Sequence, residues 1–168
     1  DGGRYKDEKS ILAQVEKMLK EGATFIDIGA FSSRPNAALI SEEEELLRIL
    51  PIVELLIKEF PNAMLSIDTF GSNVAAKCIE AGAALVNDIS AGRLGEKMLP
   101  TIAKYQVPYI MMHMRGIPQN MQQKTDYDDL LVDILHFLFI LPLFQINSCI
   151  YPFNDPFSSQ IHHYRSDV

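Results

Sequence analysis

One unit occurs twice in this chain: a helical stretch, then Gly-Ala, then a short apolar run that ends in polar side chains. The first copy places Gly22 five residues before Asp27, and the second places Gly82 five residues before Asn87. Short, almost wholly apolar strands that alternate with helices are typical of a parallel sheet covered by helices. The recurrence therefore predicts an α/β chain built from successive strand–helix units.

The apolar periodicity along the chain predicts where these elements lie. The expected strands are 24–28, 64–69, 84–89 and 107–114. The expected helices carry apolar side chains at helical spacing, and they are a first one around 11–19, then 42–59, 72–82, 97–105 and 127–139. About four strand–helix units are therefore visible.

Two helix starts have recognisable capping residues. Ser41-Glu-Glu-Glu44 matches a capping box at the start of the long helix, and Ser72 is expected to cap the short one. The acidic run 42–45 suits the positive end of a helix dipole, so we interpret it as a solvated helix start.

Polar residues at the strand ends distinguish between two α/β architectures. Asp27, Asp68, Asn87 and His113 stand at four successive strand ends. A doubly wound sheet would concentrate its chemistry at one switch point, usually beside a glycine-rich first loop, and the sequence has no such loop. The even distribution favours a partial (β/α)8 TIM barrel, with residues 1–139 as the barrel domain.

The last part of the chain has a different composition. All nine glycines lie at or before Gly116, the last Glu is Glu96 and the last Lys is Lys124. Further barrel units would need glycines in turns and charges on their outer helix faces. We therefore expect residues 140–168 to form an irregular tail outside the native barrel. Because the chain starts at Asp1 and shows half of a barrel, we expect a fragment that is inactive alone.

Composition excludes several classes of function. The net charge of −7 argues against a nucleic-acid surface, which needs a basic stripe. The most apolar stretch, 130–146, is interrupted by Asp133, His136 and Pro142 and is too short to cross a membrane. Cys78 and Cys149 fit neither a metal spacing nor a disulfide framework. We expect a cytoplasmic protein.

Asp68 and Asn87 are the strongest candidates for ligand binding. A carboxylate at the end of an apolar strand is costly unless it is paired, so Asp68 is more often a ligand group than a core residue. Asn87 can donate and accept hydrogen bonds, which suits the edge of a heterocycle, although a role in a turn is equally open. Asp88 points to the opposite side and is interpreted as structural. His113 is either a base or a residue satisfied by a neighbour.

The loop after the first strand offers groups for an anionic ligand. Ser33 and Arg34 follow Asp27 within eight residues, and Arg34 is the one well-placed cation for a phosphate. An ordinary loop with a capping Asp is the alternative. The sequence contains no zinc spacing, nucleophile elbow or Walker loop.

Five motifs in order resemble dihydropteroate synthase. They are Asp-Gly-Gly-Arg-Tyr (1–5), Asp-Ile-Gly…Ser-Ser-Arg-Pro (27–35), Ser-Ile-Asp-Thr (66–69), Asn-Asp-Ile (87–89) and Met-His-Met-Arg-Gly…Pro…Met-Gln (112–122). The resemblance implies a (β/α)8 barrel of folate biosynthesis that joins dihydropterin hydroxymethyl diphosphate to p-aminobenzoate and releases pyrophosphate. It also implies Mg²⁺, a homodimer and an enzyme that sulfonamides target.

The resemblance assigns roles to individual residues. Asp68 and Asn87 would hydrogen-bond the pterin. Met112 and Ile89 would lie against its ring. The loop residues Ser33, Arg34 and Pro35 would contact the diphosphate and p-aminobenzoate. Asp1, an acid of the first loop, would help to order magnesium and would stabilise the cationic pterin intermediate. Asp1 and Arg34 would be catalytic.

The sequence also departs from the family pattern. Many members have Gly-Gly-Glu-Ser-Thr-Arg-Pro-Gly where this chain has Gly29-Ala-Phe-Ser-Ser-Arg-Pro-Asn36. The first strand with its magnesium-binding Asn, the motifs of strands six to eight and the usual dimer helices are absent, so we expect no metal ligand in this chain. Two alternatives remain: a methyltransferase that passes methyl from a folate to a corrinoid, and a non-catalytic remnant of the barrel.

Overall fold

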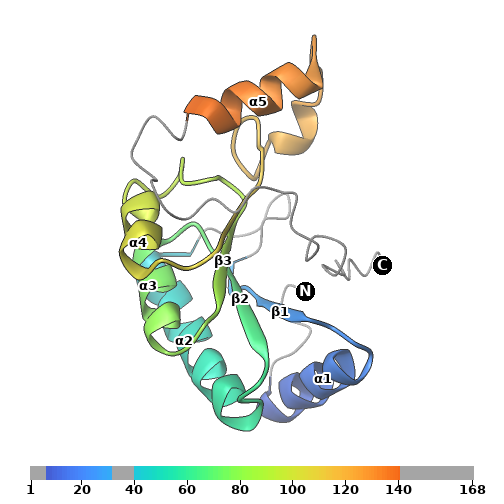
Figure 1. Ribbon diagram of the computed structural model, residues 1–168, viewed down its shortest axis with the longest axis vertical. Helices are drawn as coiled ribbons and strands as arrows, with labels where there is room; N and C mark the ends of the chain where they lie inside the picture. Colours follow the sequence, from blue (N-terminus) through green and yellow to red (C-terminus); the bar gives the residue numbers. More distant parts are fainter. Residues whose placement is uncertain (1–6, 32–39, 141–168) are drawn as a thin grey trace.

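The computed structural model describes residues 7–31 and 40–140. Helices and strands alternate along this part of the chain (Figure 1). The elements in chain order are α1 (Glu8–Lys20), β1 (Phe25–Ile28), α2 (Glu42–Glu59), β2 (Met64–Asp68), α3 (Ser72–Glu80), β3 (Leu85–Asp88), α4 (Met98–Tyr105), β4 (Tyr109–Met111), a 3-10 turn η1 (Met121–Gln123) and α5 (Leu130–Ile140).

The four strands form one parallel sheet in the order β1-β2-β3-β4. Each strand therefore lies beside the next one in the chain, as in a barrel, and no strand crosses over to the other edge. Figure 1 shows α2, α3 and α4 side by side along one side of the sheet. These features confirm the prediction of an α/β fold with four strand–helix units of a partial (β/α)8 barrel.

The repeated helix–Gly-Ala–strand unit has the same backbone geometry in both copies. Gly22 and Gly82 adopt φ of 96° and 113°, values that favour glycine because it has no Cβ. In each copy the glycine N–H donates to the carbonyl three residues earlier, and the following alanine N–H donates to the carbonyl five residues earlier. This pair of hydrogen bonds is the Schellman motif, which ends a helix and turns the chain back toward the sheet.

The core lies between the sheet and its helices. Leu65 and Ile67 of β2 are fully buried and alternate with Ser66 and Asp68, which face the other side. The buried residues that pack with them come from α1, α2 and α3, and they are Val15, Ile49, Val53, Leu56, Val74 and Cys78. The helices therefore cover one face, and the opposite face carries the polar side chains of the strand ends.

Several predicted boundaries differ from the structure. β4 covers only Tyr109–Met111 of the expected 107–114, and α5 begins at Leu130 rather than at 127. Ser72 does not cap α3, because Gly71 occupies the cap position and makes no side-chain bond there. The acceptor for this helix start comes instead from α2, where Glu42 Oε1 accepts a hydrogen bond from Asn73 N at 2.8 Å.

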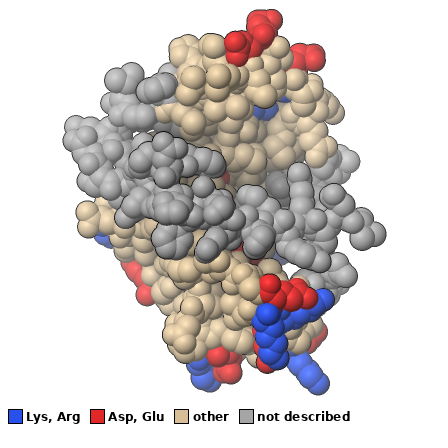
Figure 2. Space-filling model, turned by 45° about the vertical axis from the view of Figure 1, so that its right-hand side comes forward, with Lys and Arg blue, Asp and Glu red and all other residues tan. Residues whose placement is uncertain are grey.

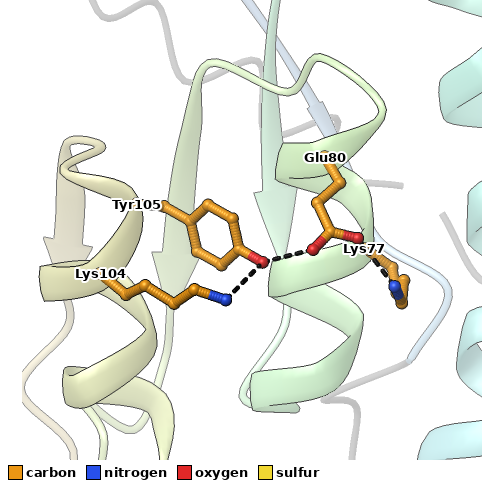
Figure 3. Close-up of polar contacts among 4 residues, drawn as sticks. All are labelled: Lys77, Glu80, Lys104 and Tyr105. Carbon is orange, nitrogen blue, oxygen red and sulfur yellow. Dashed lines mark hydrogen bonds and ion pairs between the residues drawn. The ribbon is translucent and has the colours of Figure 1, made fainter.

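α3 and α4 are also joined by polar contacts at the surface (Figure 3). Glu80 accepts hydrogen bonds from Lys77 Nζ at 2.7 Å and from the Tyr105 hydroxyl, and Lys104 Nζ donates to that hydroxyl at 3.3 Å. All four side chains belong to the outer helical layer, so these contacts support the packing of two neighbouring helices.

Acidic and basic side chains are mixed on the described surface. On α1, Glu16 pairs with Lys20 and Lys17 with Glu21. In Figure 2 the Lys and Arg side chains in the lower part of the molecule lie next to Asp and Glu. Among the described helices, none is both long enough and apolar enough to cross a bilayer. The predicted irregular tail lies outside the described residues, apart from Ile140 at the end of α5.

Candidate functional site

Three of the predicted polar residues lie on the same face of adjacent strands. The sheet register pairs Asp27 with Ser66 and Asp68 with Asn87. Side chains two residues apart on a strand share a face, so Ser66 and Asp68 point the same way. The side chains of their partners Asp27 and Asn87 therefore point away from the helices as well. Asn87 Nδ2 donates a hydrogen bond to Asp27 Oδ2 at 3.3 Å. The structure thus brings together Asp27, Asp68 and Asn87, as expected from their places at successive strand ends.

The pKa of Asp68 is strongly raised. Burial raises its pKa from 3.8 to about 7, and the negative charges of Asp27, Glu45 and Asp88 act in the same direction. A carboxyl group with such a pKa is held out of bulk water among like charges. It is therefore poised to meet a cationic or hydrogen-bond-donating ligand.

Gly29 brings the end of β1 close to Asp68. A Cβ at this position would lie 3.2 Å from Asp68 Cβ and 3.3 Å from its Oδ2. The missing side chain therefore provides the space that the Asp68 carboxylate occupies. The sequence contained Gly29 within the Asp-Ile-Gly motif, but only the packing shows why glycine is needed there.

Asp88 has the structural role that was predicted for it. It is fully buried, and its carboxylate accepts hydrogen bonds from Ser90 N and Oγ at 2.7 Å and from Gly92 N at 2.8 Å. The Tyr109 hydroxyl donates a fourth bond at 2.6 Å. Burial, together with the Asp88 charge and this bond, raises the pKa of Tyr109, which keeps it a donor. Asp88 thus fixes the turn that follows Asn87.

Ile89 and Met112, the two residues predicted to contact the pterin ring, both lie at the carboxyl ends of their strands. Ile89 is half-buried in the turn directly after β3, and Met112 is 36% exposed directly after β4. Met112 N donates to the Asp88 carbonyl oxygen at 3.1 Å, so the two strand ends are tied together. The positions of both residues are compatible with an apolar contact to a ligand bound near Asn87. That contact stays a prediction.

His113 contacts α5 rather than the acidic group at the strand ends. Its Nε2 lies 3.7 Å from Asp133 Oδ2, and its ring meets the edge of Phe137 with centroids 4.8 Å apart. Arg115 also approaches Asp133, at 3.5 Å from Nε to Oδ2. Of the two roles considered for His113, the geometry favours a residue satisfied by neighbours. In Figure 1, α5 lies beside the loop after β4 and away from the helical layer.

The prediction of a solvated acidic run at the start of α2 is wrong for Glu45. This side chain is only 4% exposed. Burial raises its pKa, a hydrogen bond with Thr69 opposes this effect, and the charge of Glu42 adds to it. The signal was present in the sequence, because Glu45, Ile49, Val53 and Leu56 recur at helical spacing on the buried face. Position on the helix, rather than residue type, decides the burial.

Four predicted site residues lie outside the described residues: Asp1, Ser33, Arg34 and Pro35. Their roles stay predictions. Within 7–31 and 40–140, no cluster of three or more His, Cys, Asp or Glu side chains could hold a metal ion. The described residues alone therefore do not fit a magnesium site, and we derive no chemical step through magnesium.

A parallel sheet with helices on one face and polar side chains at the carboxyl ends of its strands defines the class of (β/α)8 barrel enzymes. The family model described as "Pterin binding enzyme" matches residues 1–139. The chain therefore belongs to the family of pterin-binding enzymes.

Named relatives agree with this assignment. The folic acid synthesis protein fol1 of Pneumocystis carinii is 49% identical over 127 residues, which are 76% of this chain and 17% of the relative. The dihydropteroate synthase of Synechocystis is 41% identical over 137 residues, which are 82% of this chain and 47% of the relative. The chain thus spans about half the length of this bacterial relative and less of the fungal one.

A solved structure shows the same arrangement of elements. The dihydropteroate synthase of Yersinia pestis, in a complex with a sulfonamide drug, matches with a TM-score of 0.76 and 41% identity. The match covers 83% of this chain and 50% of the other. The fold similarity, like the sequence similarity, therefore extends over half of a complete enzyme.

Proposed function

We propose that a full-length enzyme containing this chain is a dihydropteroate synthase, which condenses dihydropterin hydroxymethyl diphosphate with p-aminobenzoate and releases pyrophosphate. The observation that carries the proposal is the group Asp27, Asp68 and Asn87 on the face of the sheet opposite the helices, with Asn87 Nδ2 3.3 Å from Asp27 Oδ2. Relatives named dihydropteroate synthase support it.

The chemistry of the group matches the proposed reaction. Loss of diphosphate from a methylene carbon attached to an electron-rich ring spreads positive charge into the ring. A carboxylate that is already placed in a partly dehydrated site stabilises such charge more than water does. Asp68 would accept hydrogen bonds from the pterin N–H groups, and its negative charge would stabilise the ring as the carbon–oxygen bond breaks.

Asn87 would fix the orientation of the ring. Its amide nitrogen is engaged by Asp27, which leaves the amide oxygen as an acceptor and the second N–H as a donor. Ile89 and Met112 would supply apolar contact to the two-ring plane. With the pterin held in this way, the p-aminobenzoate amine needs positioning more than it needs a strong base.

The diphosphate end of the site would depend on the segment around Arg34. The proposal assigns Arg34 to the leaving diphosphate, Ser33 and Pro35 to the same loop, and Asp1 to the cationic intermediate. Mg²⁺ belongs to the proposal as a cofactor of the full-length enzyme, held by residues other than the described ones, and no step of the reaction is assigned to it. Homodimer formation, a cytoplasmic location and inhibition by sulfonamides belong to the same proposal, and the last is supported by the Yersinia complex.

The test is an assay of a full-length enzyme that contains residues 1–139. Dihydropteroate formation from the pterin diphosphate and p-aminobenzoate is expected, with no methyl transfer from methyltetrahydrofolate to a corrinoid. Methyl transfer without dihydropteroate formation would replace the proposal with the methyltransferase alternative. Pterin binding without either reaction would support the non-catalytic alternative.

A further inference from the structure

Tyr109 of β4 lies on the helix side of the sheet and connects the core to the strand ends. Its ring packs against a buried apolar cluster between the sheet and the helices α3 and α4, made of Ala75, Val86, Met98 and Ile102. Its hydroxyl donates a hydrogen bond to Asp88 Oδ2 at 2.6 Å. Because a buried polar group without a partner is costly, this bond fixes the hydroxyl and the carboxylate together.

Asp88 joins the turn after β3 to the end of β4. Its carboxylate accepts three hydrogen bonds from the turn and one from the Tyr109 hydroxyl. Its carbonyl oxygen accepts from Ala91 N at 3.2 Å in the turn and from Met112 N at 3.1 Å after β4. The side chain and the backbone of this one residue therefore both bind the two segments.

The turn after β3 depends on these bonds for its conformation. Ala91 and Gly92 are consecutive residues with positive φ, 52° and 81°. Alanine rarely adopts positive φ, because its Cβ then lies too close to a carbonyl oxygen. Such strain persists only where the surrounding contacts hold it, and the bonds that Asp88 accepts from the turn are contacts of this kind.

The two segments that Asp88 joins carry the two predicted contacts to the pterin ring. Ile89 directly follows Asp88, and Met112 directly follows β4. The bond from Tyr109 and the bond from Met112 N both end on Asp88. The position of Ile89 relative to Met112 therefore depends on how firmly Asp88 is held.

We propose that Tyr109 is a positioning residue for the pterin ring: its hydroxyl holds Asp88, and Asp88 sets the position of Ile89 relative to Met112. This inference rests on the proposed function, because the two side chains contact a pterin only in that reading. Tyr109 itself does not touch the ligand in this account. Its effect reaches the ring through Asp88.

Calorimetry distinguishes a positioning role of Tyr109 from a purely structural one. Loss of folded enzyme lowers the number of binding sites per chain and leaves the Kd of the remaining sites unchanged. Displacement of Ile89 or Met112 in a folded enzyme raises Kd and leaves the number of sites unchanged. The two roles therefore appear in different measured quantities.

The experiment is calorimetry of a pterin that lacks the diphosphate, bound to the full-length enzyme and to its Tyr109→Phe variant. Phenylalanine keeps the ring in the apolar cluster and removes only the hydroxyl. We expect Kd to rise about tenfold with the stoichiometry kept, because Asp88 loses its side-chain bond to β4. In steady-state kinetics, KM for the pterin diphosphate should rise, and KM for p-aminobenzoate should stay near the wild-type value.

Ile102→Val is the matched control, since Ile102 belongs to the same apolar cluster and is 1% exposed. It should lower the stability of the enzyme and leave Kd unchanged, because every bond to Asp88 is kept. A rise in Kd in this control equal to that in Tyr109→Phe would overturn the inference, as would an unchanged Kd in Tyr109→Phe.

Ser90→Ala decides the matter if Tyr109→Phe does not fold. It removes the other hydroxyl that donates to Asp88, from Ser90 Oγ to Oδ1 at 2.7 Å, and should also raise Kd. In that case an unchanged Kd in Ser90→Ala would overturn the inference. A wild-type enzyme that binds no pterin would instead refute the proposed function and this inference with it.

Discussion

Asn87 and Asp27 are joined by a hydrogen bond of 3.3 Å from Nδ2 to Oδ2, although β2 lies between their strands. A carboxylate can only accept, so the amide nitrogen must face Asp27 and the amide oxygen must face elsewhere. The bond therefore fixes which edge Asn87 presents to a ligand. It also spans the strand that ends in Asp68, which places all three side chains in one group.

Gly29→Ala should weaken pterin binding without unfolding the enzyme. The added methyl would lie 3.2 Å from Asp68 Cβ and 3.3 Å from Oδ2, so the carboxylate must move. We expect a loss of about 1–3 kcal/mol in the binding free energy of a bare pterin, measured by calorimetry. Gly22→Ala is the control: its φ of 96° makes alanine strained, yet no atom lies within 4 Å of the new methyl. Equal losses of affinity in both variants would contradict the role of Gly29.

Asp88→Ala should destabilise the fold by about 3–5 kcal/mol, because four donors lose their acceptor in a buried position. Tyr109→Phe removes one of these donors and should cost about 1–3 kcal/mol. Denaturant unfolding measures both. A Tyr109→Phe loss as large as that of Asp88→Ala would show that the carboxylate does not organise the turn through its other three bonds.

The free energy of unfolding should fall as the pH rises from about 4 to about 7. Asp68 has a pKa of about 7 when folded and an ordinary value of 3.8, so the folded state holds a proton that the unfolded state has released. This stabilisation is fully present below pH 3.8 and is lost as the pH rises through 7. Denaturation of the full-length enzyme over this range, compared with Asp68→Asn, isolates the contribution. An identical slope in both proteins would show that Asp68 has no raised pKa.

Arg34→Ala should separate the loop from the pterin pocket. In a full-length enzyme, we expect impaired use of the pterin diphosphate and of p-aminobenzoate, because a cation that stabilises the leaving group is lost. Binding of a pterin without diphosphate should stay nearly intact, as measured by calorimetry. A parallel loss of bare pterin affinity would mean that Arg34 supports the pocket itself.

The three-residue group was predictable from local patterns in the sequence, and the strand order from the polar residues at successive strand ends, which favoured a barrel. The spacing from Gly22 to Asp27 and from Gly82 to Asn87 determines where each strand begins and which side chains reach its end. Adjacent parallel strands then bring those ends together. Neither step requires knowledge of side-chain packing.

The contacts that hold the site were harder to predict because they depend on tertiary packing. Glu45 belongs to an acidic run in the sequence, although its position on the apolar face of α2 leads to burial. Ser72 is a typical capping residue, but the acceptor at the start of α3 is Glu42 of another helix. The closeness of Gly29 to Asp68 follows from the approach of two strand ends and has no local signal.

Steady-state kinetics of Asp68→Asn in a full-length enzyme tests the central claim most directly. Asparagine keeps the size of the side chain and removes the charge that is proposed to stabilise the developing cation. We predict a loss of about 2 kcal/mol or more in transition-state stabilisation, seen as a fall in kcat/KM of about thirtyfold or more, in a variant that remains folded. A value of kcat/KM close to that of the wild type would contradict the assignment of Asp68 and the pterin site built around it.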